Sequence, residues 1–205
     1  MEKIIIATKN PGKAKEFQKL FSDQYEIVTL NDLTDLPTII ENGSTFKENA
    51  TIKAQTIYKA TNETVIADDS GLVVDALNGE PGIYSARYAK DHDSKANMDK
   101  LINKIKKIPP QKRTAHFITV LVVISKYGKI EETGRVDGLI IEHPKGNDGF
   151  GYDPIFYYPP KDKTFAEMTM SEKNQISHRG KAMEQLIKDW PEYLKGENNE
   201  NLNLQ

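Results

Sequence analysis

The chain has 205 residues, of which 38% are hydrophobic and 28% charged, and its formal net charge is -2. This length allows one substantial core, the composition is that of a soluble globular protein, and the weak acidity argues against a general nucleic-acid binder. Cysteine is absent, which excludes disulfides and thiolate metal sites. The first residues lack the features of a signal peptide, and no apolar run reaches the roughly 18 residues of a membrane helix. We therefore expect a cytoplasmic protein with no membrane partner.

The N-terminal segment alternates between predicted strands and helices. Residues 3–7 form an unbroken apolar run that predicts a buried strand. Asn10 is a suitable N-cap and Pro11 a suitable first helical residue, so a helix is expected to follow. Its apolar face is predicted to consist of Phe17, Leu20 and Phe21. A second strand over 26–30 and a loop over 37–43 come next.

A second helix is predicted to begin with a capping box, in which Thr45 is the cap and Glu48 lies three residues further on. It is expected to run to about residue 61, where Asn62 helps to end it. The apolar run that follows stops at the adjacent acids Asp68 and Asp69. These read as a strand end, because burying an unpaired charge is costly. Successive strand side chains point to opposite faces, so only one of the two acids can face a given cleft.

The second half contains a longer hydrophobic pattern. A helix is predicted over 94–108, a strand buried on both faces over 115–125, and a second strand over 130–141, after a hairpin turn at Tyr127-Gly128. Residues 144–160 are rich in glycine, proline and aromatic residues and are predicted as a loop. The last helix begins after Ser177, with an apolar face made of Met183, Leu186, Ile187 and Trp190. We predict one α/β domain over residues 1–195 and a disordered tail over 196–205.

Two predicted helix starts carry cations where the helix dipole favours acids. The first has Lys13 and Lys15, and the last has His178, Arg179 and Lys181. Both starts are explained if they face an anion such as a phosphate chain. The alternative is that these long side chains extend into water.

A polyphosphate ligand would require a divalent cation, and Mg²⁺ prefers one or two carboxylates together with phosphate oxygens. The chain has no Walker motif and no dinucleotide-binding glycine pattern. Candidate carboxylates are Glu41, Glu48, Asp68 and Asp69, although Glu48 has a competing role in the capping box. By strand alternation, Asp68 is expected to face away from Asp69, towards a structural partner that the sequence does not name.

The segment Phe150-Gly151-Tyr152-Asp153 places two aromatic residues around a glycine. It is either a platform on which a base stacks or a loop that covers the core. Tyr84 and Arg87 are weaker candidates for the same cleft.

Six motifs in this order resemble the inosine triphosphate pyrophosphatase family, also known as the dITP/XTP pyrophosphatases. The matching stretches cover 7–13, 41–50, 67–72, 81–88, 149–156 and 172–182, and the resemblance spans about residues 3–190. One departure is Lys9, where many members have glycine.

The resemblance implies a long mixed β-sheet with helices forming two lobes around a central substrate cleft, and a homodimer. It also implies Mg²⁺-dependent hydrolysis of the non-standard purine nucleotides ITP, dITP and XTP to the monophosphate and pyrophosphate, which cleanses the nucleotide pool. By analogy, Asp69 is the general base and a metal ligand, and Glu41 is the second metal ligand. The substrate-binding residues that it implies are Thr8, Lys9, Asn10, Pro11, Gly12, Lys13, Ser70, Phe150, Gly151, Tyr152, Asp153, Lys173, His178 and Arg179.

Two other functions remain open on sequence alone. One is a non-catalytic nucleotide-binding or sensing module, which the presence of both Glu41 and Asp69 disfavours. The other is a pyrophosphatase of the same architecture that acts on a different modified base.

Overall fold

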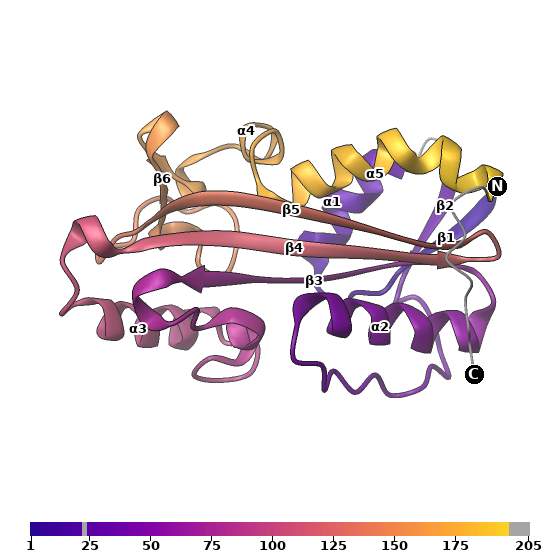
Figure 1. The fold of residues 1–205 in the computed structure, drawn as a ribbon, viewed down its shortest axis with the longest axis horizontal. Coiled ribbons are helices and arrows are strands. Elements are labelled where there is room, and N and C mark those ends of the chain that lie inside the picture. The colour runs from indigo at the N-terminus through magenta and orange to yellow at the C-terminus, as the bar shows by residue number, and fades with distance from the viewer. Residues whose placement is uncertain (22–23, 197–205) are drawn as a thin grey trace. The chain divides into compact units, whose positions relative to one another are not determined.

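The structure is a computed structural model that describes residues 1–21 and 24–196, with only the backbone described at residues 19 and 20. The described residues form a seven-stranded sheet in the order β2-β1-β3-β4-β5-β6-β7 (Figure 1). The strands are β1 Glu2–Ile6, β2 Tyr25–Thr29, β3 Thr64–Val74, β4 Thr114–Ser125, β5 Gly128–Ile140, β6 Phe156–Tyr158 and β7 Lys163–Thr164. Because β1 pairs in parallel with β2 and β3 while β6 pairs antiparallel with β5 and β7, the predicted mixed sheet is confirmed.

Helices connect these strands. The α-helices are α1 Pro11–Phe21, α2 Phe46–Thr61, α3 Ser94–Ile105, α4 Met170–Asn174 and α5 His178–Lys195. Short 3₁₀ helices cover Asp75–Leu77, Gly82–Arg87, Pro110–Lys112, Asp153–Ile155, Pro159–Lys161 and Phe165–Glu167. None of the helices in the described part of the chain is long and apolar enough to cross a membrane.

The chain forms two compact units, each assembled from separate segments. Of the described residues, the first unit contains those within 1–69, 120–133 and 182–196, and the second contains 70–119 and 134–181. Strands β3, β4 and β5 each contribute one part to the first unit and the other part to the second. The single domain over 1–195 stays a prediction, and the predicted tail, apart from Gly196, lies outside the described residues.

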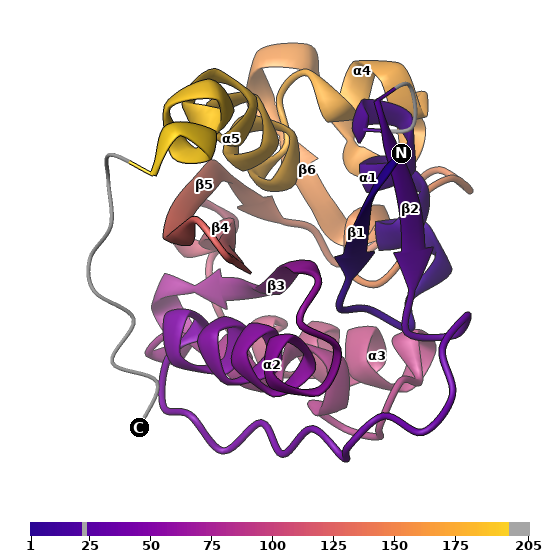
Figure 2. The same ribbon diagram turned by 90° about the vertical axis from the view of Figure 1, so that its right-hand side faces the viewer.

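In the first unit, helices cover both faces of the sheet. Side chains alternate along β1, so that Ile4 and Ile6 pack with α1 and α5 while Ile5 packs with α2 on the opposite face. Strand β4 alternates in the same way with residues 120–124, all of them buried, which confirms the predicted burial on both faces for this part of the strand, whereas His116 and Ile118 are only partly buried. Figure 2 shows α5 and α2 on opposite sides of these strands.

The predicted apolar faces of α1 and α5 are largely confirmed. Phe17 and Phe21 are buried, whereas the side chain of Leu20 lies outside the described residues. On α5 the buried residues Met183, Leu186 and Trp190 follow the predicted spacing, but Ile187 is 42% exposed. Ile187 was therefore wrongly assigned to the core. It lies at the margin of the stripe, where the helix face turns from the sheet to solvent.

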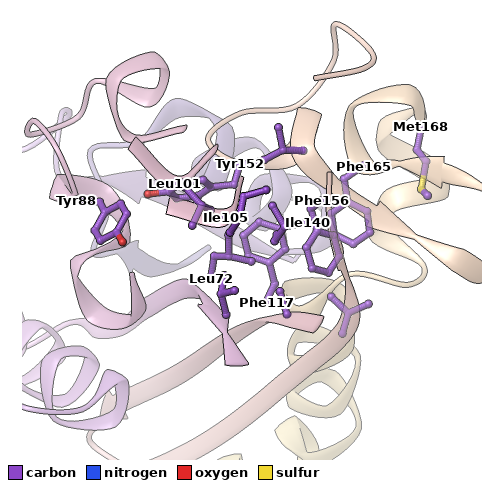
Figure 3. Close-up of a cluster of buried hydrophobic side chains, with 14 residues drawn as sticks. Leu72, Tyr88, Leu101, Ile105, Phe117, Ile140, Tyr152, Phe156, Phe165 and Met168 are labelled. Atoms are coloured by element: carbon purple, nitrogen blue, oxygen red, sulfur yellow. The ribbon is translucent and has the colours of Figure 1, made fainter. Parts of the chain in front are cut away.

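The second unit has its own core, to which α3, β3, β4, β5 and the segment 152–168 contribute. Figure 3 shows its aromatic centre, where the ring centroids of Phe156 lie 4.6 Å from Phe117 and 4.8 Å from Phe165. Leu101 and Ile105 of α3 are fully buried here. Helix α3 ends at Ile105, three residues before the predicted end. Strand β6, which lies inside the predicted loop 144–160, was missed.

Gly180 marks a close approach of α5 to the backbone of α4. A Cβ atom at Gly180 would lie 1.7 Å from the carbonyl oxygen of Asn174, whereas one at Gly82 would meet nothing within 4 Å. We expect Gly180→Ala to lower the unfolding free energy by about 3 kcal/mol, since backbone cannot yield as a flexible side chain does. Gly82→Ala, at a φ of +56°, should cost only about 1 kcal/mol of backbone strain. Urea unfolding of the two variants measures the difference, and equal losses would contradict the predicted clash.

Candidate active site

Strand β3 carries both acids in its middle. The strand runs without interruption from Thr64 to Val74, so the predicted strand end at Asp68-Asp69 is wrong. The apolar runs on either side of the acids belong to this one strand. The run before the acids packs into the core of the first unit, and the run after them packs into the core of the second.

Asp68 is buried and forms an ion pair with the first turn of α1. The side chain is 1% exposed, and its Oδ2 lies 2.7 Å from Nζ of Lys13. This pair identifies the structural partner of Asp68, which the sequence left unnamed. It also explains why a lysine is tolerated at the electropositive end of α1.

Asp69 lies beside two lysines and two other acids. Burial raises the pKa of Asp69 to about 6, while the charges of Lys53 and Lys13 lower it and those of Glu41 and Asp68 raise it. Asn49 donates a hydrogen bond from Nδ2 to Oδ2 of Asp69 at 3.3 Å. A carboxylate with this pKa is ionised at neutral pH and basic enough to accept a proton from water.

Glu41 is held beside α2 by Lys53. The Nζ of Lys53 lies 3.3 Å from Oε1 of Glu41 and donates to the carbonyl oxygen of Asp68 at 3.0 Å. The Glu41 side chain remains 33% exposed. Sequence reasoning missed Lys53, although a lysine on the same helix face as Ala50 and Ala54 was an available signal.

Glu48 has the structural role that competed with metal binding. Its Oε2 accepts hydrogen bonds from the backbone N of Ser44 at 2.6 Å and from the Ser44 hydroxyl at 2.7 Å, and these bonds lower its pKa. Thr45 caps α2 as predicted, with its hydroxyl oxygen accepting from the backbone N of Glu48 at 3.1 Å. In a capping box the Glu48 carboxylate would accept from the backbone N of Thr45, whereas here it accepts from the backbone N of Ser44. The predicted capping box is wrong in this detail.

The segment from Thr8 to Lys13 is fixed by local hydrogen bonds. The predicted cap is confirmed, since Oδ1 of Asn10 accepts from the backbone N of Gly12 at 2.9 Å and of Lys13 at 3.3 Å. The hydroxyl oxygen of Thr8 accepts from the backbone N of Asn10 at 3.1 Å. Lys9 is exposed, and its carbonyl oxygen accepts from Asn31.

The donor set of the first unit fits a magnesium ion. The part of the chain that the structure describes has no group of three or more His, Cys, Asp or Glu side chains suited to a metal. Mg²⁺ does not need one, because it binds through one or two carboxylates and takes its remaining oxygens from phosphates and water. Glu41 and Asp69 supply two carboxylates close enough for the charge of one to raise the pKa of the other.

In the second unit, Asp153 and Lys173 form a buried ion pair. The Nζ of Lys173 lies 2.6 Å from Oδ2 of Asp153, and the two side chains are 7% and 4% exposed. The same oxygen accepts from the backbone N of Phe150 at 2.8 Å. A Cβ at Gly149 would lie 2.1 Å from it, so only glycine fits beside this carboxylate.

Phe150 presents a partly exposed ring to two cations. Its centroid lies 4.7 Å from Nζ of Lys173 and 5.9 Å from Cζ of Arg179, within the range of cation–π contacts. Arg179 is buried and donates to the hydroxyl of Ser70 at 3.1 Å. An exposed ring beside buried donors suits the stacking and recognition of a planar base.

Two other predicted substrate-binding residues are part of the packing of the second unit. The Tyr152 hydroxyl donates to the carbonyl oxygen of Ser85 at 2.9 Å, and burial raises its pKa. The ring of His178 stacks on Phe117 with centroids 4.9 Å apart. Tyr84 and Arg87 contact each other, the Arg87 guanidinium lying 5.2 Å from the Tyr84 ring.

Comparison with known proteins gives a consistent family. The model of the Ham1 family matches residues 4–189. A curated dITP/XTP pyrophosphatase of Leuconostoc mesenteroides subsp. mesenteroides is 52% identical over 95% of this chain and 100% of its own. Solved structures of Ham1 proteins from Staphylococcus aureus and Coxiella burnetii match with TM-scores of 0.83 and 0.85 and identities of 44% and 38%, covering 96% and 94% of this chain and 100% of theirs. The chain belongs to the Ham1 family.

Proposed function

We propose that this protein is a nucleoside triphosphate pyrophosphatase that hydrolyses ITP, dITP and XTP to the monophosphate and pyrophosphate and so cleanses the nucleotide pool. The observation that carries this proposal is the pair Asp69 and Glu41: a half-buried carboxylate with a pKa of about 6 beside a second, partly exposed one. The name of the Leuconostoc relative, a dITP/XTP pyrophosphatase that aligns over its whole length, supports dITP and XTP as substrates.

Asp69 is the general base in this proposal. The oxygen of a water molecule bonds to the α-phosphorus, the bond from that phosphorus to the bridging α–β oxygen breaks, and the water proton goes to Asp69. The pKa of about 6 leaves Asp69 ionised at pH 7. The positive charges of Lys53 and Lys13 favour the ionised form of Asp69.

Glu41 and Asp69 would hold Mg²⁺ in this proposal. When bound, Mg²⁺ neutralises negative charge on the phosphate oxygens and orients water. The ion pair with Lys53 keeps the Glu41 carboxylate beside α2.

Phosphate binding is assigned to residues 8–13 and to Ser70. The local bonds of Asn10 and Thr8 support this assignment, because they fix the backbone at the start of α1, where a helix dipole favours an anion. Lys13 pairs with Asp68, so its ammonium group is already held in place before a phosphate binds. Ser70 directly follows Asp69 in β3.

Base recognition is assigned to residues 150–153 and to Lys173, His178 and Arg179. Lys173 and Arg179 carry only hydrogen-bond donors, which suits the 6-keto oxygen of inosine and xanthine. The 6-amino group of ATP is itself a donor and would leave such groups unmatched, a mismatch that strongly rejects a substrate. The nearest rival function is a pyrophosphatase that uses the same site to bind a different modified base. A homodimer and a cytoplasmic location are also proposed, on the sequence alone.

A competition panel tests the substrate assignment. Purified protein with Mg²⁺ should convert dITP, ITP and XTP with a kcat/KM at least about 100-fold above that for ATP, the ratio expected when a site built to bind a polar group meets the wrong one. GTP, dUTP and a methylated purine triphosphate complete the panel. A preference for dUTP or the methylated purine triphosphate would support the rival substrate, whereas a preference for GTP or equal turnover of ATP would overturn the assignment.

A further inference from the structure

The loop that carries Glu41 is bound to α2 by an ion pair and hydrogen bonds. Glu41 pairs with Lys53 at 3.3 Å, the backbone N of Gly43 donates to Oδ1 of Asn49 at 2.8 Å, and Ser44 donates to Glu48. Later residues of the loop therefore contact earlier residues of the helix, as in an antiparallel arrangement. The loop that holds one candidate metal ligand is therefore fixed to a rigid element.

Of the α2 residues that bind this loop through hydrogen bonds, Asn49 also contacts β3 with its side chain. Its Oδ1 is occupied by Gly43, so its Nδ2 faces the other way, and that nitrogen donates to Oδ2 of Asp69. Asn49 is 1% exposed, so its amide has no room to rotate away. One side chain thus joins the backbone two residues after Glu41 to the carboxylate of Asp69.

The backbone of this loop lies very close to α2 at Gly43. A Cβ atom at Gly43 would lie 2.8 Å from Oδ1 of Asn49 and 2.7 Å from Cβ of Glu48. Residue 43 must therefore be glycine for the loop to reach the amide. Lys53, one helical turn after Asn49, lies on the same face and bonds to Glu41 and to the carbonyl of Asp68.

We propose that Asn49 is a positioning residue that sets the separation of the Glu41 and Asp69 carboxylates and so their ability to bind one Mg²⁺ together. This inference rests on the proposed function, which assigns the metal to these two residues. The amide is suited to the task because it is neutral. It orients Asp69 without adding a positive charge that would repel the metal or a negative charge that would raise the pKa of Asp69 further. Groups that orient metal ligands in this way typically affect metal affinity by about 10- to 100-fold.

The test is Mn²⁺ binding in the absence of nucleotide, followed by electron paramagnetic resonance of the free ion, with Mg²⁺ competing. Asn49→Ala should weaken binding by about tenfold or more. Gly43→Ala, which displaces the loop without touching Asp69, should weaken it in the same direction and serves as the second variant if Asn49→Ala folds poorly.

Asn97→Ala is the matched control. Asn97 is likewise buried in the first turns of a helix and ties a loop to it, accepting from the backbone N of Ala89 at 2.6 Å and of Lys90 at 3.0 Å. Its loss should lower the thermal midpoint about as much as Asn49→Ala and leave Mn²⁺ affinity unchanged. Unchanged Mn²⁺ affinity in folded Asn49→Ala, with normal binding by the wild type, overturns this inference alone. A wild type that binds Mn²⁺ no better than Asp69→Asn overturns the metal assignment of the proposed function and this inference with it.

Discussion

Asp69→Asn is expected to fold normally and to lose turnover by a factor of about 10² to 10⁴, the usual contribution of a general base. Asparagine has nearly the same shape and keeps an oxygen that can accept from Asn49, but it cannot take a proton from water. The loss should appear in kcat for dITP at saturating Mg²⁺. Asp99→Asn, on the exposed side of α3, is the control and should match the wild type. Retained turnover in Asp69→Asn would remove Asp69 as the base.

The same substitution is expected to increase stability above neutral pH. The pKa of Asp69 is about 6 in the folded protein against an ordinary value of 3.8. Between these values the folded state holds a proton that the unfolded state has released, so the unfolding free energy falls as pH rises, with the loss complete above pH 6. It amounts to about 3 kcal/mol at most. Asp69→Asn lacks this loss and should therefore be more stable than the wild type at pH 8, with the difference vanishing towards pH 4. Urea titrations at the two pH values measure it, and a constant difference would contradict the shifted pKa.

Lys173→Met is expected to destabilise the second unit by about 3–5 kcal/mol, the cost of removing one partner of a buried ion pair. Both side chains are almost fully buried and 2.6 Å apart, so Asp153 would lose the charge that offsets its own burial. The loop at Phe150 would also lose a cation beside its ring, and KM for dITP should rise.

A second substitution separates the charge from the packing. Asp153→Asn in the Lys173→Met background removes the stranded charge and should recover most of the lost stability, but not the KM. The control is Lys188→Met, which breaks an exposed pair with Glu184 and should leave stability and KM unchanged. If the double variant is less stable than Lys173→Met, the loss does not come from an uncompensated charge.

The elements with a clear hydrophobic period could be predicted from the sequence. Strands β1 and β4 were read from unbroken apolar runs, helix α5 from its apolar period and helix α2 from the capping residues at its start. Strands β6 and β7 and helix α4 were missed because elements of two to five residues are too short to show one. The strand end placed at Asp68 was wrong because a local pattern does not reveal that Asp68 is buried, with Lys13 of α1 pairing with its carboxylate and Lys53 of α2 donating to its carbonyl oxygen.

In the candidate site, too, the features that depend on neighbouring residues could be predicted, and the contacts between distant residues could not. Strand alternation indicated that Asp68 and Asp69 face opposite ways, and the cap at Asn10 followed from local chemistry. The pairing of Asp68 with Lys13 joins residues 55 positions apart in the numbering, and no local pattern encodes it. Asn49 and Lys53 were overlooked because a polar residue on a helix is usually solvated, although Lys53 shares its helix face with the apolar Ala50 and Ala54.

The most direct measurement is the identity of the products formed from dITP with Mg²⁺, read by ³¹P nuclear magnetic resonance. Hydrolysis between the α- and β-phosphates predicts dIMP and pyrophosphate in equal amounts from the first turnover, with water oxygen in the phosphate of dIMP when the reaction is run in ¹⁸O-labelled water. Formation of dIDP and orthophosphate, or no metal-dependent product at all, would contradict the proposed function of this protein.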